Sequence, residues 1–341
     1  MRAEPRGGFV RIAHVVRSDS FAGIEKYIST VAPRLAARGC DVVVIGGESA
    51  RMAAASDLVR WRPASTTWQV AREITHLGRL DIVHAHMTAA EVAAVITTPW
   101  HRAHRVTTLH FASPRGARGT RVLLVPLGWF MEEQIAISEF VATAVDASCV
   151  LPNGVESTQP GPSTRDRHVL VMQRLEEEKH TDVALRAWSA SRLRDHGWRL
   201  VIAGRGSRAQ ELRQLCADLG ISESVQWLGF VNDPTHLLAH AGVLLAPAPA
   251  EPFGLTVVEA MACATPVIAA DGGAHRETVG VDGWLFPPGD VAACVRLLDD
   301  IENRNPLAYG DRLRSRQLRL FDVEAHTDQL LQVYLRLATQ R

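Results

Sequence analysis

Two glutamates eight positions apart, Glu251 and Glu259, mark the stretch of this sequence with the clearest capacity for chemistry. They bracket a Pro-Phe-Gly turn between an apolar run that predicts a buried strand and one that predicts a helix. The first amides of a helix lack partners, and the helix dipole favours anions there. Glu251 ends the strand, where α/β sheets bind ligands, and Glu259 lies one turn inside the helix, where it can accept hydrogen bonds from hydroxyls. A ligand that places phosphate beside the helix amides and hydroxyls beside the two carboxylates would be a sugar nucleotide. The motif therefore indicates a sugar nucleotide as the ligand.

Two cations follow another predicted strand, His168–Met172. Arg174 and Lys179 could clamp a diphosphate, the first as a bidentate donor and the second as a point charge. Three glutamates lie between them, however, so this segment by itself favours an exposed charged loop.

Glycines at two strand-to-helix junctions could bring backbone close to a ligand. Gly204 and Gly206 follow the predicted strand at Arg199, and Gly23 precedes the first predicted helix. The first pair lacks the third glycine of a dinucleotide fingerprint. A plain tight turn therefore explains the pair as well as ligand binding does, and the same alternative holds for Gly23.

Histidines end two predicted strands. His110 could hydrogen-bond a sugar hydroxyl or the reacting oxygen, or it could be a structural donor. His84 and His86 share one face of a strand, which permits metal binding, but the sequence places no third ligand near them. The sequence therefore predicts no metal site.

The stretch from Thr120 to Met131 is apolar and follows Arg115, Arg118 and Arg121. Such a pattern can form a basic-apolar surface for a lipid acceptor. Packing of a helix into the core is the interpretation that the pattern favours.

Composition limits the class of protein. The chain has 341 residues, enough for two domains, and 37 basic residues balance 37 acidic ones, which gives no sign of nucleic-acid binding. Five scattered cysteines fit a reducing compartment. The first residues lack a secretory apolar segment. We therefore expect a cytoplasmic protein, with peripheral contact at the inner face of a membrane left open.

Short β-branched runs alternate with helical patterns along the chain. A polar, Pro/Gly-rich segment that starts at Thr158 interrupts this alternation and is typical of a linker, and the alternation resumes after it. This alternation predicts an α/β protein with two Rossmann-like, doubly wound domains of parallel strands and a cleft between them. The predicted parts are an N-terminal acceptor-side domain (1–158), a C-terminal donor domain (165–320) and a final helix (321–341).

In chain order these segments resemble the retaining glycosyltransferases of family 4, which have the GT-B fold. The two-glutamate motif is the specific part of the likeness, which extends over nearly the whole chain. Weaker parts are the Gly23 loop, Ala136–Phe140, Leu151–Val155, the Arg174/Lys179 and Gly204/Gly206 pairs, and Asp271–Glu277. In that family the tail helix crosses back onto the first domain.

The resemblance implies a donor site. Its candidate catalytic residues are His110, Arg174, Lys179 and Glu251. Its candidate donor-binding residues are Gly23, Gly204, Gly206, Phe230, Val231, Gly254, Leu255, Thr256 and Glu259. By this likeness the two cations and the backbone after Gly254 hold the diphosphate, Glu259 holds the ribose, and Glu251 and His110 lie beside the sugar. Gln173 and Ala22 replace glycines that are usual in the family.

The implied function is transfer of a sugar, with retention, from a UDP-, GDP- or ADP-sugar to a hydroxyl of a glycan, lipid-linked or small-molecule acceptor, without a metal or other cofactor. Two alternatives stay open at this point. One is a sugar-nucleotide epimerase of similar two-lobed architecture, and the other is a non-catalytic sugar-nucleotide-binding protein. A nicotinamide dehydrogenase would need the complete glycine fingerprint.

Overall fold

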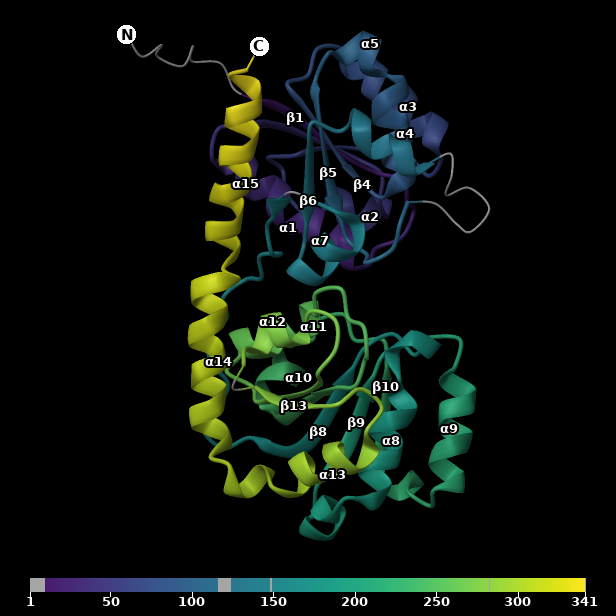
Figure 1. Ribbon diagram of the computed structural model, residues 1–341, viewed down its shortest axis with the longest axis vertical. Helices are drawn as coiled ribbons and strands as arrows, with labels where there is room; N and C mark the ends of the chain where they lie inside the picture. Colours follow the sequence, from purple (N-terminus) through teal and green to yellow (C-terminus); the bar gives the residue numbers. More distant parts are fainter. Residues whose placement is uncertain (1–9, 116–123, 148, 282, 341) are drawn as a thin grey trace. The chain divides into compact units, whose positions relative to one another are not determined.

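The computed structural model of the protein describes residues 10–115, 124–147, 149–281 and 283–340. The chain divides into two compact units (Figure 1). Unit 1 comprises residues 1–154 and 323–341, and unit 2 comprises residues 155–322. Each unit contains a parallel sheet with interleaved helices, which confirms the predicted α/β class.

The sheet of unit 1 has the strand order β3-β2-β1-β4-β5-β6-β7. The strands are β1 (Arg11–Val16), β2 (Asp41–Ile45), β3 (Arg60–Arg62), β4 (Ile82–His86), β5 (His104–Leu109), β6 (Glu133–Ala136) and β7 (Cys149–Val150). The helices are α1 (Gly23–Ala37), α2 (Ser49–Ala53), α3 (Thr67–Leu77), α4 (Thr88–Ile96), α5 (Thr98–His101), the 3-10 helix η1 (Val125–Phe130), α7 (Glu139–Val145) and α15 (Val323–Ala338).

Strand periodicity divides the core of unit 1 into two layers, because successive side chains of a strand point to opposite faces. On β1, Ile12 and Val16 join the core under α1 and α15, whereas Ala13 and Val15 join the core under α3 and α4. His14 has the same parity as Ile12. The face under α1 and α15 therefore also receives the polar residues of the sheet.

Unit 2 has the strand order β10-β9-β8-β11-β12-β13. Its strands are β8 (Asp166–Met172), β9 (Arg199–Ala203), β10 (Val225–Gly229), β11 (Ala241–Ala246), β12 (Val267–Ala270) and β13 (Trp284–Phe286). Its helices are α8 (Thr181–Ala190), α9 (Ala209–Asp218), α10 (Thr235–His240), α11 (Leu255–Ala262), α12 (His275–Val279), α13 (Val291–Asp299) and α14 (Pro306–Leu320), with the 3-10 turns η2 (Glu177–Lys179), η3 (Arg192–His196), η4 (Ser222–Ser224) and η5 (Ile301–Asn303).

The last helix, α15, belongs to unit 1 and packs on α1. Glu324 of α15 forms ion pairs with Arg34 and Arg38 of α1 at 2.8 and 2.9 Å. Gly154 makes the close approach possible, because a Cβ there would lie 2.7 Å from the Cα of Val323. The return of the chain to its first unit thus depends on a residue without a side chain.

The structure contains short strands that the sequence pattern did not reveal. β3, β7 and β13 have two or three residues each. A period-2 alternation needs about four residues before it can be recognised, and these strands lie at or next to the edges of their sheets. Their positions follow from pairing with longer neighbours.

Candidate active site

The carboxyl ends of β8 and β11 meet at the switch point of the unit 2 sheet. The chain goes from β8 to β9 on one side and returns to β11 on the other. Loops leaving adjacent strands at such a point diverge and leave room for a ligand. The segments that carry Lys179 and Glu251 are these two loops.

Lys179 and Glu251 meet in the structure. The Lys179 Nζ lies 2.6 Å from Oε2 of Glu251, and the two side chains are only 15 and 19% exposed. The Gln173 side chain fixes the lysine loop, because its Nε2 donates to the carbonyl of Lys179 and to Oγ1 of Thr181, both at 2.9 Å. The departure from glycine at position 173 therefore adds an anchor for this loop.

Arg174 does not join this pair. Its side chain is 63% exposed and pairs with Glu178, four residues on, at 2.6 Å. An exposed pair of this kind contributes little to stability, so its guanidinium can exchange partners at low cost. The structure thus places Lys179 beside Glu251 and leaves Arg174 exposed at the surface.

The start of α11 lies beside the Lys179–Glu251 pair. Gly254 precedes the helix with φ 86°, and no side chain caps its first amides. Leu255 and Thr256 form the first turn and are half-buried, and Glu259 lies one turn further on, also half-buried. The first amides of a helix attract anions. The helix begins after the Pro-Phe-Gly turn as predicted, whereas Glu251 lies in the loop five positions beyond the end of β11 and not at the strand end, because the strand is shorter than the sequence pattern indicated. Binding of a diphosphate by this motif stays a prediction.

His275 is a residue of this site to which sequence reasoning assigned no role. Its ring is buried, and its Nδ1 donates to the carbonyl of Ala270 at 3.0 Å. Burial lowers the pKa of His275; Glu251 opposes this effect and Lys179 adds to it. A Cβ on Gly254 would lie 3.3 Å from its Cδ2. The sequence did contain a signal for this residue, namely a histidine shortly after a predicted strand and a Gly-Gly turn.

Close packing of two loops explains why positions 204 and 206 are glycines. A Cβ at Gly204 would lie 1.9 Å from the carbonyl oxygen of Gln173, and one at Gly206 would lie 2.2 Å from that of Leu175. The loop after β9 therefore runs against the loop after β8 at a distance that only glycine allows. This supports the tight-turn interpretation, and donor contact by the two glycines stays a prediction.

The end of β10 carries an exposed aromatic side chain. Phe230 is 48% exposed, and the guanidinium carbon of Arg205 lies 5.9 Å from its ring centroid. Val231 follows and is half-buried. A flat apolar surface beside a cation at the carboxyl edge is compatible with the predicted contact to a base, which stays a prediction.

In unit 1, Gly23 is the first residue of α1 and is exposed. The carboxylate of Glu25 already accepts a hydrogen bond from the Ala22 amide at 2.9 Å. This buried glutamate supplies negative charge at the start of α1, which weakens the case for a phosphate there. The predicted role of Gly23 is not established by this geometry.

His110 directly follows β5, as predicted, and is only 9% exposed. Its Nε2 lies 3.1 Å from Nδ1 of His86. The structure also supplies the third ligand that the sequence did not reveal, because His14 of β1 lies beside His84 and His86 of β4. One nitrogen from each of these rings lies within 4.8 Å of the others, and this candidate cation site is empty.

The apolar stretch before Met131 differs from the expected buried helix. Residues 125–130 form the 3-10 helix η1, in which Leu127 is buried. Trp129 is 85% exposed and Phe130 52% exposed, so core packing accounts for only part of the stretch. Arg118 and Arg121 lie outside the described residues, and Arg115 pairs with the buried Glu91 at 2.7 Å.

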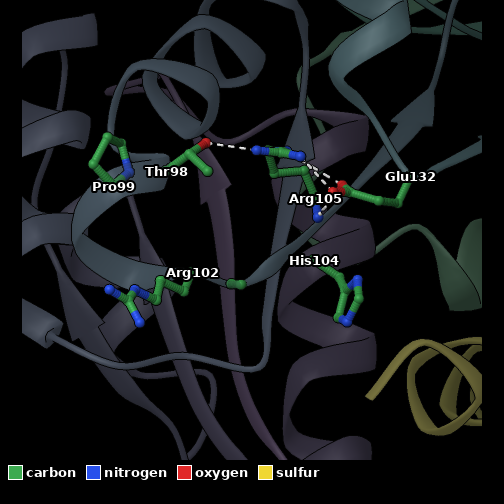
Figure 2. Close-up of a pocket in the computed structure, with 7 residues that line it drawn as sticks. Thr98, Pro99, Arg102, His104, Arg105 and Glu132 are labelled. Carbon is green, nitrogen blue, oxygen red and sulfur yellow. Dashed lines mark hydrogen bonds and ion pairs between the residues drawn. The ribbon is translucent and has the colours of Figure 1, made fainter. Parts of the chain in front are cut away.

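A pocket of about 510 Å³ lies at the opposite, amino edge of the unit 1 sheet (Figure 2). Figure 2 shows Arg105 between Thr98 and Glu132, to which its guanidinium is bound. The polar groups of Thr98, Arg105 and Glu132 thus satisfy one another. None of the predicted site residues lines this pocket, so it is not the candidate active site.

Two parallel Rossmann-like sheets with interleaved helices place this protein in the GT-B fold class. A family model described as Glycosyl transferases group 1 matches residues 155–315, and one described as Glycosyltransferase Family 4 matches residues 21–159. Together the two models span residues 21–315, and the chain belongs to this family of glycosyltransferases.

The chain is also similar to individual proteins and to solved structures. A D-inositol 3-phosphate glycosyltransferase of Acidothermus cellulolyticus is 29% identical, over 81% of this chain and 78% of its own. An exopolysaccharide phosphotransferase of Streptomyces coelicolor is 30% identical over 60% of this chain, which spans only 22% of that relative. The crystal structure of Anabaena HepE in complex with UDP-glucose superposes with a TM-score of 0.82 at 22% identity, covering 95% of this chain and 98% of that one.

No helix in the described part of the chain is both long enough and apolar enough to cross a membrane.

Proposed function

We propose that this glycosyltransferase moves a hexose from a nucleoside diphosphate sugar to an acceptor hydroxyl, with retention and without a metal. The observation that carries the proposal is the Lys179–Glu251 pair, which lies beside the uncapped start of α11 at the β8/β11 switch point. This arrangement offers a cation and free amides to a diphosphate and carboxylates to hydroxyls. The HepE structure with UDP-glucose provides independent support for the class of donor.

In the proposed reaction the bond between the sugar C1 and the diphosphate oxygen breaks as the acceptor oxygen bonds to C1 from the same face. The sugar passes through an oxocarbenium-like state, and the departing phosphate oxygen takes the proton of the acceptor. Lys179, Arg174 and the α11 amides stabilise the charge that grows on the diphosphate. Glu251 is already paired with Lys179, so we assign it to a sugar hydroxyl and not to a covalent intermediate.

Binding of the donor is expected to shift one of the two lysine resonances in the NMR spectrum of the protein. The chain contains only two lysines, Lys26 and Lys179, so protein labelled with ¹³C at the lysine Cε gives one resonance for each. Titration with UDP-, GDP- and ADP-sugars should shift the Lys179 resonance for the correct donor and raise the melting temperature by mass action. A Lys26→Arg variant assigns the two signals.

An unmoved Lys179 signal under saturating concentrations of all three donor classes would contradict the proposal. Product analysis then separates the remaining activities. Glycoside formed in the presence of an acceptor identifies the transferase, free epimer identifies an epimerase, and binding without release of the diphosphate identifies a binding protein.

Glu259→Ala is expected to weaken nucleoside diphosphate binding roughly tenfold or more, because a carboxylate that binds hydroxyls contributes about 1.5–3 kcal/mol. Calorimetry with the free nucleotide measures this change without turnover. Glu223→Ala is the matched control, since Glu223 is exposed and precedes β10 at the amino edge of the sheet. Equal affinities of Glu259→Ala and wild type would remove the ribose role of Glu259.

A further inference from the structure

Met87 of unit 1 has a backbone conformation that destabilises the chain. It connects β4 to α4 with φ 75° and ψ 151°, in a region that is open to glycine and rarely adopted by residues with a side chain. Five other described residues that are not glycine have positive φ, but their φ lie between 49 and 56°, close to the left-handed helical value of about 57°. Met87 is therefore the strained outlier among the described residues.

The strain at Met87 arises because β4 and α4 have no loop between them. His86 is the last residue of β4 and pairs with both neighbouring strands, and Thr88 is already the first residue of α4. A single residue must therefore turn the chain from strand to helix. In the turn after β2 the chain uses Gly46 and Gly47, both with positive φ. A methionine at such a turn indicates that its side chain has a use that outweighs the strain.

Met87 lies at the switch point of the unit 1 sheet. The chain goes from β1 to β2 on one side and returns to β4 on the other. Loops that leave adjacent strands at such a point diverge, and ligands of α/β proteins bind there. The same topology marks the Lys179–Glu251 site of unit 2. A strained residue at the corresponding point of unit 1 indicates a separate binding site in that unit.

The edge of the sheet at this switch point carries exposed apolar side chains. Met87 is 41% exposed, and Phe111, which follows β5, is 51% exposed. The residues directly before them, His86 and His110, are joined by a hydrogen bond of 3.1 Å between their rings, so Met87 and Phe111 leave the sheet at neighbouring points. Large apolar groups exposed at a ligand-binding edge indicate a ligand with an apolar part.

The loop after β1 gives the same edge a polar side. Asp19 and Ser20 are exposed, and the hydroxyl oxygens of Ser18 and Ser20 lie 2.9 Å apart. Hydroxyl and carboxylate oxygens can hydrogen-bond the hydroxyls of a ligand. The switch point of unit 1 thus offers polar groups after β1 and apolar groups after β4 and β5.

We propose that this edge of unit 1 binds the acceptor, and that the acceptor carries an apolar group, such as an alkyl or aryl chain, beside its hydroxyls. Met87 contacts that group and is a specificity-determining residue. Phe111 supplies a second apolar surface, directly after His110, which the family resemblance places beside the transferred sugar. That the bound molecule receives a sugar rests on the proposed function; the binding site for an amphipathic molecule does not.

Packing of Met87 into the core is the competing explanation for a methionine at this position. Burial of the side chain would then offset the strain without any ligand. Met87 belongs to neither of the two core layers described for unit 1, and two-fifths of its surface remains exposed. That exposed surface is available to a ligand.

Paired substitutions at position 87 test the strain. Alanine normally gives a more stable protein than glycine, because glycine loses more backbone freedom on folding. At position 87 we expect the reverse order, with a melting temperature of Met87→Gly about 3 °C above that of Met87→Ala. Thr143 is the matched control, since it is exposed in the regular helix α7, and Thr143→Ala should be more stable than Thr143→Gly.

NMR of protein labelled with ¹³C at the methionine methyl groups tests the ligand. The chain has six methionines, and loss of one resonance in Met87→Leu assigns that of Met87. Octyl β-glucoside below its micelle concentration and methyl β-glucoside are the probes, because they share the sugar and differ in the apolar group. We expect octyl glucoside to shift the Met87 resonance and to bind at least about tenfold more tightly than methyl glucoside, as burial of apolar surface predicts.

Variants locate the apolar contact. Met87→Leu keeps an apolar side chain and should keep the affinity for octyl glucoside, whereas Met87→Gln, of similar length but polar, should bind it about tenfold more weakly. Ile96→Gln is the matched control, because Ile96 is 40% exposed and ends the same helix that begins after Met87, and its affinity should equal that of the wild type.

An unmoved Met87 resonance, equal affinities for the two glucosides, or an unchanged affinity of Met87→Gln would overturn the inference. A melting temperature of Met87→Ala at or above that of Met87→Gly would remove the strain on which it depends. Octyl glucoside that binds as expected, without turnover of any nucleotide sugar by the protein, would overturn the proposed function instead.

Discussion

At about pH 5, unit 1 is expected to unfold while unit 2 stays folded. Burial lowers the pKa of five histidines in unit 1, to about 3 for His14 and His110, to about 4 for His326, and well below 6.5 for His84 and His86. Below pH 6.5 the unfolded chain binds protons at these rings and the native unit does not, so the free energy of unfolding decreases as the pH falls.

The expected size of this effect is large. Each shifted histidine lowers stability by roughly 1 kcal/mol per pH unit in that window. Five of them together remove several kcal/mol between pH 6.5 and 5, against a total of about 5–15 kcal/mol for a folded domain. In unit 2 the pKa of one histidine, His275, is lowered in the same way, so its loss should be far smaller.

Hydrogen exchange read by mass spectrometry resolves the two units, because each peptide reports on its own segment. Peptides of β1, β4, β5 and α15 should lose protection together as the pH falls, before those of β8 and β11. A His14→Gln variant should give a less steep transition, since one proton fewer is taken up. Protection of unit 1 that persists at pH 5, or loss that begins in unit 2, would contradict the linkage argument.

Lys179→Ala is expected to lower turnover of the donor roughly a hundredfold, the range found when one preorganised donor to a developing charge is removed. The same change leaves Glu251, which is 19% exposed, without its cation. An unpaired carboxylate would itself repel a diphosphate. A single variant therefore combines two effects, loss of a phosphate contact and gain of a repulsive charge.

The double variant Lys179→Ala/Glu251→Gln separates these effects, because it removes both members of the pair. If Lys179 binds the diphosphate, the double variant stays well below Glu251→Gln alone. Recovery to the level of Glu251→Gln would show that the lysine only neutralises its partner, and the diphosphate role would be lost. Arg304→Ala breaks an exposed ion pair with Asp300 in the same unit and should leave turnover unchanged.

The predicted strands agree closely with the observed ones where the apolar runs are long. The strand expected at His168–Met172 lies within β8, and the one expected at Arg199 begins at that residue as β9. Burial on both faces of a parallel sheet requires continuous apolar runs, and such runs are visible in a sequence. Where a strand has three residues or fewer, as in β13, the pattern is too short to read.

The sequence by itself determined the α/β class, the family and the two-glutamate motif, because local apolar periodicity and turn residues are properties of neighbouring positions. Only the tertiary structure decided which distant side chains meet. It paired Lys179 with Glu251, left Arg174 exposed, and joined His14 to His84 and to Tyr334, which lies 250 positions beyond His84. Those contacts depend on the strand order of each sheet and on the packing of α15 against unit 1. Neither can be read from the spacing of residues along the chain.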